Sequence, residues 1–228
     1  TARVALVGPH NAMNVAQAVA ASWDLLGRAG MPADERMRRI GHALSLAHPP
    51  PGRLEPVHDE RDDIAVFVDY AHTDDALGRT LESVRDVAPA DTLLRVVFGC
   101  GGERDRSKRS RMGLAAATHA DRIVVTSDNP RRESPSRIVA DVLDGVPGAR
   151  REAVEVHIDR GRAIRAAIES AARGDVVVIA GKGHETTQTL PDGEGGTITR
   201  SFDDRLEARA ALEARRSRRA TPAGGLAV

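Results

Sequence analysis

From about residue 64 onward, short apolar segments alternate with amphipathic ones, and this alternation limits the fold more than any other feature of the sequence. The segments 64–68, 93–98, 122–126 and 175–180 are apolar almost throughout, which is typical of strands buried on both faces of a parallel sheet. Between them, segments such as 74–87 place apolar residues three and four positions apart, as one buried helix face requires. This pattern predicts an α/β fold with a Rossmann-like, mostly parallel sheet.

Weaker patterns complete the expected order of elements. The basic segment that follows Gly102 opens a helix that is expected to run to about Ala117. A polar hairpin is expected around Asp192 and Gly193, because both are turn-forming residues. We also expect a short strand at 154–158 and helices at 135–144, 160–172 and 203–217.

A stiff, proline-rich segment at 48–52 marks a domain boundary, because consecutive prolines exclude a helix there. Before it, a strand-like segment at 4–7 precedes helical patterns at 15–26 and 34–46. The sequence thus predicts a short N-terminal part, an α/β domain, and a tail that is small and polar enough to fray. Their expected bounds are 1–52, 53–217 and 218–228.

The overall charge is balanced, because 33 lysines and arginines face 33 aspartates and glutamates. This balance argues against general binding to nucleic acid or to a membrane surface. The single cysteine, Cys100, cannot form an internal disulfide, and no apolar run has the length of a membrane span or a signal peptide. We therefore expect a cytoplasmic protein, and the start at Thr1 just before a strand leads us to expect a fragment.

Three loops directly follow predicted strands, at 99–109, 128–132 and 181–185. Right-handed crossovers bring the carboxyl ends of parallel strands to one edge of the sheet. Ligands of open α/β proteins bind at this edge, so we expect the three loops to form one site.

The second loop begins with Asp128, Asn129, Pro130 and Arg131, which places an acid, an amide and a guanidinium at the end of a buried strand. A carboxylate binds an ammonium, and an arginine binds a carboxylate through two parallel hydrogen bonds. The loop therefore predicts a zwitterionic ligand such as an amino acid. The alternative is an ordinary surface turn, since Asp-Asn-Pro is common turn chemistry.

The other two loops carry further candidates. The glycines at 99–102 allow close approach of a ligand, and Arg104 is the nearest of five cations that follow, although these cations are also typical of a solvated helix face. The segment 181–185 lacks the spacing of a phosphate-binding loop. We therefore favour Glu185 over Lys182, because a second carboxylate at this edge can bind a second ammonium.

Asp69 ends another strand, in the position where an acid often binds ribose hydroxyls. The following residues have a simpler alternative role, because Thr73 or Asp74 can cap the next helix and His72 can be an ordinary exposed histidine. The sequence contains neither zinc-ligand spacing nor a Gly-X-Ser-X-Gly motif.

These motifs together resemble the Mur ligases of peptidoglycan synthesis, and among them the ligases that add diaminopimelate. The resemblance covers nearly the whole chain and departs from the usual family pattern at Asp74, Glu103, Ser110 and Thr187. The matching segments are GPHNAMN at 8–14, PGRLE at 51–55, VDYAHTDDAL at 68–77, FGCGGERDRSKR at 98–109, TSDNPR at 126–131, GKGHE at 181–185 and FDDR at 202–205.

The resemblance implies three domains in the complete protein, of which this chain holds the end of the central ATPase domain, to about residue 52, and the whole C-terminal domain. It also implies an ATP-dependent amide ligase, with magnesium as cofactor. Such a ligase adds meso-diaminopimelate to UDP-N-acetylmuramoyl-L-alanyl-D-glutamate. The phosphate-binding loop lies outside this chain, so we expect no catalytic residue, no metal site and no ATPase activity in the chain alone.

Residue by residue, the resemblance implies two sets of contacts. Arg131 is implied to select diaminopimelate over lysine, because lysine lacks the distal carboxylate. The meso-diaminopimelate contacts are Arg104, Asp128, Asn129, Pro130, Arg131, Gly181 and Glu185. The ATP contacts are Asn11 and Asn14 near adenine, and Arg53, Asp69, His72 and Thr73 around the ribose and phosphates.

Two other functions remain open at this point. A folylpolyglutamate synthase-like ligase shares the architecture, although Arg131 and the segment 181–185 argue against it. A non-catalytic module that binds an amino acid or a nucleotide is the second alternative, because the chain lacks a phosphate-binding loop.

Overall fold

The computed structural model describes residues 8–220 and divides the chain into two compact units, residues 1–50 and 51–228. The division lies in the proline-rich segment where the sequence predicted a boundary. The first unit contains the helices α1 (Pro9–Arg28) and α2 (Ala33–Ser45). Arg36 joins them, because its guanidinium lies 4.3 Å from the centre of the Trp23 ring. The predicted strand at 4–7 lies outside the described residues.

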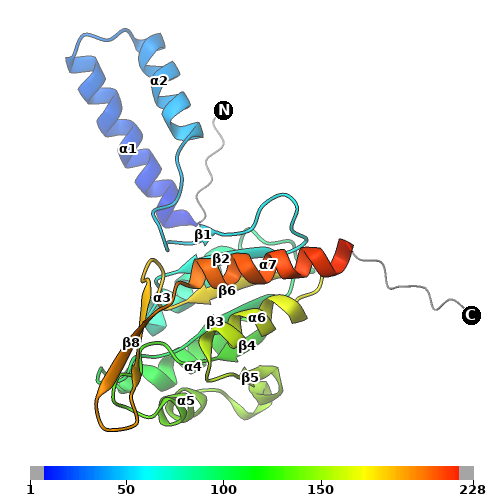
Figure 1. The fold of residues 1–228 in the computed structure, drawn as a ribbon. Coiled ribbons are helices and arrows are strands. Elements are labelled where there is room, and N and C mark those ends of the chain that lie inside the picture. Colours follow the sequence, from blue (N-terminus) through cyan, green and yellow to red (C-terminus); the bar gives the residue numbers. More distant parts are fainter. Residues whose placement is uncertain (1–7, 221–228) are drawn as a thin grey trace, which may run out of the picture. The chain divides into compact units, whose positions relative to one another are not determined.

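The second unit is built on a six-stranded sheet with the order β1-β2-β6-β3-β4-β5 (Figure 1). All neighbours pair in parallel except β1, which runs antiparallel to β2. The central strands consist of valine, isoleucine and other apolar residues, and β3 and β6 are buried along their whole length. The strands are β1 (Glu55–Pro56), β2 (Ala65–Asp69), β3 (Leu94–Phe98), β4 (Arg122–Val125), β5 (Val154–Val156) and β6 (Val176–Ala180).

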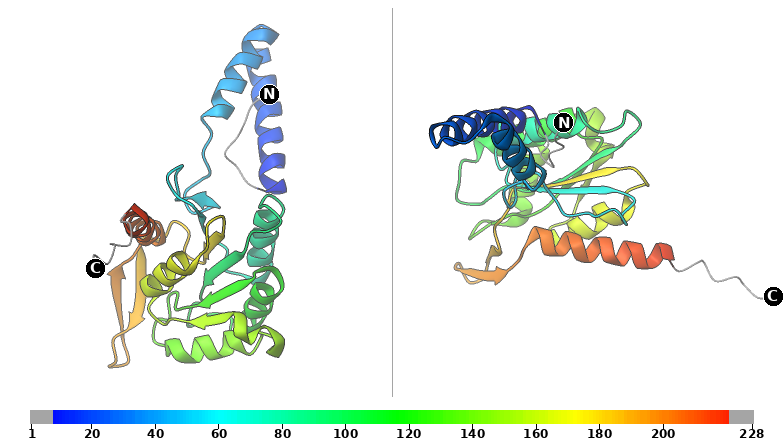
Figure 2. Two further views of the ribbon diagram at one scale, coloured as in Figure 1. Left: turned by 90° about the vertical axis from the view of Figure 1, so that its right-hand side faces the viewer. Right: turned by 90° about the horizontal axis from the view of Figure 1, so that it is seen from above.

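Helices cover both faces of this sheet, which explains why its strands are apolar on both sides. Figure 2 shows α3, α4 and α5 on one face and α6 and α7 on the other. A small hairpin of β7 and β8 precedes the last helix, and a 3₁₀ helix precedes β5. Their bounds are α3 (Asp74–Arg85), α4 (Ser107–His119), α5 (Pro135–Leu143), the 3₁₀ helix (Gly148–Ala153), α6 (Arg160–Ser170), β7 (Thr187–Pro191), β8 (Thr197–Ser201) and α7 (Asp204–Ala220).

The predicted α/β class and mostly parallel sheet are confirmed, and most element bounds differ by one to three residues. Residues 218–220, which the sequence assigned to the tail, belong to a helix, because α7 continues to Ala220. Two ion pairs stabilise this last turn, from Arg218 to Glu169 at 2.9 Å and from Arg219 to Asp63 at 2.9 Å. The strand β1 was not predicted, since two residues are too few to form a periodic pattern. Within residues 8–220, no helix has the length and apolar character needed to cross a membrane.

Glycine permits the close contact between α4 and α5. A Cβ atom at Gly113 would overlap the backbone carbonyl of Val142, whereas a Cβ atom at Gly148 would meet nothing within 4 Å. We expect Gly113→Ala to lower the free energy of unfolding by about 1–3 kcal/mol, because a backbone carbonyl cannot move away as a side chain can. Gly148→Ala is the matched control, with an expected change within about 0.5 kcal/mol. Urea denaturation of both variants provides the test, and equal stabilities would contradict this account of the contact.

Candidate functional site

Parallel pairing brings β3, β4 and β6 to a common edge, where the loops that follow these strands meet. In the register of the sheet, Phe98 pairs with Val125, and Val97 pairs with Ile179. The first two loops touch through glycine, because a Cβ atom at Gly102 would overlap the carbonyl of Pro130. These contacts bring the three predicted site loops together at one edge.

Arg131 is held in an unusual backbone conformation that directs its side chain along this edge. Its φ is +54°, in the left-handed region that non-glycine residues rarely adopt, and its backbone N–H donates to Thr189 at 3.2 Å. Its Nη1 donates to the carbonyls of Gly102 at 2.6 Å and Asn129 at 3.3 Å. No described residue accepts a hydrogen bond from Nε or Nη2, so half of the guanidinium is free for a ligand.

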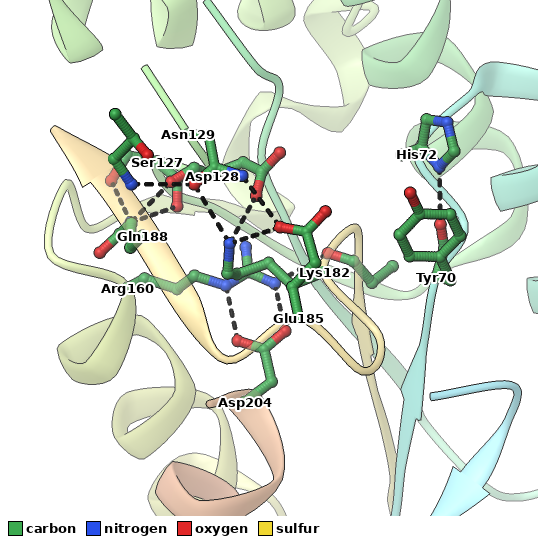
Figure 3. A network of polar contacts seen from close by, with 12 residues as sticks. Tyr70, His72, Ser127, Asp128, Asn129, Arg160, Lys182, Glu185, Gln188 and Asp204 are labelled. Atoms are coloured by element: carbon green, nitrogen blue, oxygen red, sulfur yellow. Dashed lines mark hydrogen bonds and ion pairs between the residues drawn. The ribbon is translucent and has the colours of Figure 1, made fainter. Parts of the chain in front are cut away.

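The ammonium of Lys182 lies between the second and third loops (Figure 3). Its Nζ is 3.0 Å from Glu185 Oε2, 3.2 Å from Asn129 Oδ1 and 3.5 Å from Asp128 Oδ1. The Lys182 side chain is fully buried, whereas 36% of the Glu185 side chain is exposed. Sequence reasoning preferred Glu185 and missed Lys182, because two of the three Lys182 partners belong to the second loop, and Asn129 lies 53 positions away.

A second buried cation, Arg160, supports the start of the third loop. Arg160, at the start of α6, and Asp204, at the start of α7, form an ion pair in which both side chains are fully buried. Two hydrogen bonds of 2.7 Å join them, and Arg160 Nη2 also donates to the carbonyl of Ala180 at 3.0 Å. This pair connects both helices to the last residue of β6, directly before Gly181.

The β7–β8 hairpin closes one side of the second loop. The buried Gln188 donates from Nε2 to the carbonyl of Asp128 at 2.7 Å, and the backbone N–H of Thr189 donates to Asn129 Oδ1 at 3.0 Å. The sequence predicted the hairpin but gave it no part in the site. The hairpin contacts the second loop through backbone groups and the side-chain amide of Gln188, and the sequence pattern does not reveal such contacts.

The three loops and the segment after β2 line a cavity of about 360 Å³, and most of the predicted amino-acid contacts are among its lining residues. Pro130 is the exception, because it is buried and lies outside the lining. Arg104 lines the cavity, and no described residue forms an ion pair or a hydrogen bond with its side chain. The cavity is lined by Tyr70, His72, Gly101, Arg104, Asp105, Lys108, Asp128, Asn129, Arg131, Gly181 and Glu185.

The cations that follow Arg104 are mostly engaged elsewhere. Arg109 is fully buried and pairs with Glu133 at 2.9 Å and Asp141 at 2.8 Å. Its Nη2 also donates to the carbonyl of Gly101, so it supports the glycine turn rather than a ligand. Lys108 remains at the cavity, where its Nζ donates to the carbonyl of His72 at 2.7 Å.

The predicted ATP contacts of the second unit divide into two groups. The buried Asp69 accepts hydrogen bonds from the N–H groups of Leu54 and Ala71 and from the Thr80 hydroxyl, so its carboxylate already organises the backbone. Thr73 caps α3 through a 3.2 Å hydrogen bond from Ala76 N, which is the simpler role foreseen for it. The ATP contacts of Asp69 and Thr73 stay predictions.

Arg53 and His72 are exposed, and both lie against Tyr70. Neither side chain forms an ion pair with a described residue, so both are free to meet an anion. Asn11 and Asn14 belong to α1 of the first unit, and their predicted contact with adenine stays a prediction.

Charge within the site is fixed by close partners. Burial raises the pKa of Glu185, but hydrogen bonds and charge from Lys182, together with the Asn129 amide, outweigh it and lower the pKa below the ordinary 4.5. Glu185 is therefore ionised at neutral pH.

Burial raises the pKa of the Cys100 thiol to about 12, which makes it a poor nucleophile. Across residues 8–220, no group of three or more His, Cys, Asp or Glu could hold a metal ion.

Comparison with known proteins adds independent information. Residues 52–183 match the family model described as Mur ligase, glutamate ligase domain. The chain is 45% identical over 215 residues to the UDP-N-acetylmuramoyl-L-alanyl-D-glutamate–2,6-diaminopimelate ligase of Synechococcus elongatus. The match covers 94% of this chain but only 40% of that protein.

Solved structures give a similar result. A structure of a UDP-N-acetylmuramoyl-L-alanyl-D-glutamate–2,6-diaminopimelate ligase superposes with a TM-score of 0.69 and 37% identity, covering 93% of this chain and 40% of that one. A folylpolyglutamate synthase from Thermotoga maritima has a TM-score of 0.56 and 22% identity, covering 78% of this chain and 37% of that one. At this identity, the second likeness shows the fold alone.

The buried pair of Arg160 and Asp204 is open to a direct test. We expect Asp204→Asn to lower the free energy of unfolding by about 3–5 kcal/mol, because it leaves a buried guanidinium without its counter-charge. Glu207→Gln is the matched control on the same two helices, since the exposed pair of Glu207 with Arg165 is worth at most about 1 kcal/mol. Equal losses in urea denaturation would refute the assignment of Arg160 as the support of this edge.

The lowered pKa of Glu185 predicts a pH dependence. Its contribution to stability is fully present above the unfolded-state pKa, near 4.5, and is lost as pH falls through the lower pKa of the folded chain. We expect the stability difference between the wild type and Glu185→Gln to be constant from pH 6 to 8 and to shrink as pH falls below about 4.5. Urea denaturation across this range measures it, and a difference that does not change with pH would contradict the prediction.

Proposed function

Because the chain belongs to the Mur ligase family, we propose that it is the part of an ATP-dependent amide ligase that binds and orients the incoming amino acid. The chain spans 40% of the length of its Synechococcus relative, so the complete reaction is proposed for a longer protein. One observation carries this proposal: two arginines and two acids, Arg104, Arg131, Asp128 and Glu185, line one cavity.

We propose meso-diaminopimelate as the amino acid. It has two carboxylates and two amines, and the residues that line the cavity include two arginines, Arg104 and Arg131, and two acids from the loops after β4 and β6, Asp128 and Glu185. The free half of the Arg131 guanidinium suits a carboxylate, and the Asp128 and Glu185 carboxylates suit an ammonium. L-Lysine lacks one carboxylate and would leave a desolvated arginine without a partner, which is a strong basis for rejection.

In the proposed reaction, ATP phosphorylates the D-glutamate side-chain carboxylate of UDP-N-acetylmuramoyl-L-alanyl-D-glutamate. A neutral amine of diaminopimelate then attacks the acyl phosphate, an amide bond forms and phosphate leaves. The residues of this chain hold and orient the attacking amino acid, and such positioning is a large part of catalysis for this chemistry. Magnesium, when bound to the complete protein, would neutralise phosphate charge, and we propose that other parts of that protein supply its ligands. We place the reaction in the cytoplasm.

We further propose that Arg53 and His72 contact ATP, since both are exposed and free of ion pairs within the described part of the chain. Asp69 and Thr73 would then act mainly by holding the loop between them, through the backbone hydrogen bonds that they already accept. Asn11 and Asn14 are proposed to lie near adenine.

Two alternative functions share part of this support. A folylpolyglutamate synthase-like ligase would bind glutamate, which has two carboxylates but only one amine, so it leaves one of the two acids, Asp128 or Glu185, without an ammonium partner. A module that only binds an amino acid accounts for the cavity equally well, and the decisive difference is whether the complete protein couples binding to amide formation.

Arg131→Lys tests the assignment of the carboxylate site. We expect at least about tenfold weaker binding of meso-diaminopimelate, because lysine cannot reproduce the planar two-pronged contact. Isothermal titration calorimetry measures the change. Arg132→Lys is the matched control, since the exposed Arg132 pairs with Glu103 at 2.6 Å and lies outside the cavity lining. Unchanged affinity in Arg131→Lys, or an equal loss in both variants, would overturn the assignment.

A further inference from the structure

The two lysines of this chain are both found at the same cavity. Of 33 basic residues other than histidine, 31 are arginine, and the lysines are Lys108 and Lys182. Lys108 lines the cavity, and Lys182 lies fully buried behind its acidic wall. A sequence that uses arginine almost everywhere, yet places lysine here, indicates that the site needs a compact ammonium rather than a guanidinium.

The surroundings of Lys182 match an ammonium and its three donors. Three acceptors face Nζ, which are Glu185 Oε2 at 3.0 Å, Asn129 Oδ1 at 3.2 Å and Asp128 Oδ1 at 3.5 Å. Asn129 also donates from Nδ2 to Glu185 Oε2 at 3.0 Å, so the amide and the carboxylate fix one another. The Asp128 Oδ1 atom is buried and accepts no hydrogen bond, which leaves the charge of Lys182 as its close compensation.

Lys182 thus contacts one oxygen of each carboxylate, Asp128 Oδ1 and Glu185 Oε2. The other oxygens, Asp128 Oδ2 and Glu185 Oε1, receive no hydrogen bond from any described residue, and both side chains line the cavity. Two like charges this close would repel one another and favour protonation if no cation lay between them. The positive charge of the buried Lys182 ammonium offsets this repulsion between the two carboxylates before any ligand binds.

We propose that Lys182 is a positioning residue, which neutralises the inner oxygens of Asp128 and Glu185 and so presents their outer oxygens to an ammonium of the bound diamino acid. This inference rests on the function proposed above, because it names how that site holds the amine. Figure 3 shows the arrangement, with Lys182 between the two carboxylates and Arg160 beneath them.

Other charged groups near the site do not replace Lys182. Arg160 acts on Asp128 and Glu185 only through longer-range charge, since both of its close ion-pair contacts go to Asp204. His184 lies in the same loop as Lys182, and its charge lowers the pKa of Glu185 less than the contacts of Lys182 and Asn129 do. Lys182 is therefore the one cation among the described residues that contacts both carboxylates.

The test uses Lys182→Met, which removes the charge and keeps most of the volume. Binding of meso-diaminopimelate is measured by calorimetry between pH 5 and pH 8, where the charges of the ligand stay constant. We expect the wild-type affinity to change little over this range. The variant should bind about tenfold or more weakly at pH 8 and lose further affinity toward pH 5, because a carboxylate pair without its cation takes up a proton.

Arg95→Met is the matched control, because Arg95 also forms a buried pair, with Asp175 at 3.1 Å, at the amino ends of β3 and β6. It should lower stability without any pH-dependent loss of affinity. A Lys182→Met variant with wild-type affinity, or with a loss that is uniform in pH and equal to that of Arg95→Met, would overturn the inference.

A carboxyl NMR titration of Glu185 in the ligand-free chain separates this inference from the proposed function. If the wild type does not bind meso-diaminopimelate, the proposed function fails for this chain, and the titration still decides the role of Lys182. A pKa of Glu185 that rises in Lys182→Met but not in Arg95→Met supports the inference. A pKa that is the same in all three proteins contradicts it.

Discussion

The buried ammonium of Lys182 is the contact on which the organisation of this site depends. It joins the loop after β4 to the loop after β6, through acceptors that belong to Asp128, Asn129 and Glu185. A buried cation is costly unless several acceptors compensate it, so this lysine fixes the relative position of both loops. Without it, two carboxylates would share a small volume with no counter-charge between them.

The surrounding structure makes this arrangement rigid. The Arg160–Asp204 pair anchors two helices to the end of β6, and Arg109 supports the glycine turn through the carbonyl of Gly101. The β7–β8 hairpin binds the second loop from the side through Gln188. The cavity is therefore formed by loops whose backbones are held by buried polar groups, which suits recognition of a ligand that has several charges in fixed positions.

The sequence predicts the arrangement of the strands and loops around this site better than the buried side-chain contacts within it. Strand and helix periodicity, with the rule that parallel strands end at one edge, is sufficient to bring Arg131 and Glu185 together. The roles of Lys182 and Gln188 could not be predicted, because their partners in the second loop lie 53 to 61 positions away and each contact depends on side-chain direction. Arg109 resembled its exposed neighbours in sequence, and only its packing against Glu133 and Asp141 distinguishes it.

We propose that this edge of the sheet recognises both ends of a zwitterionic diamino acid. Calorimetric titration of the wild-type chain with meso-diaminopimelate, and with L-lysine as the comparison ligand, tests this claim most directly. We expect measurable binding of meso-diaminopimelate and at least about tenfold weaker binding of L-lysine, because only the former places a second carboxylate near Arg131. Equal affinity for the two ligands, in a chain shown to be folded, would contradict it.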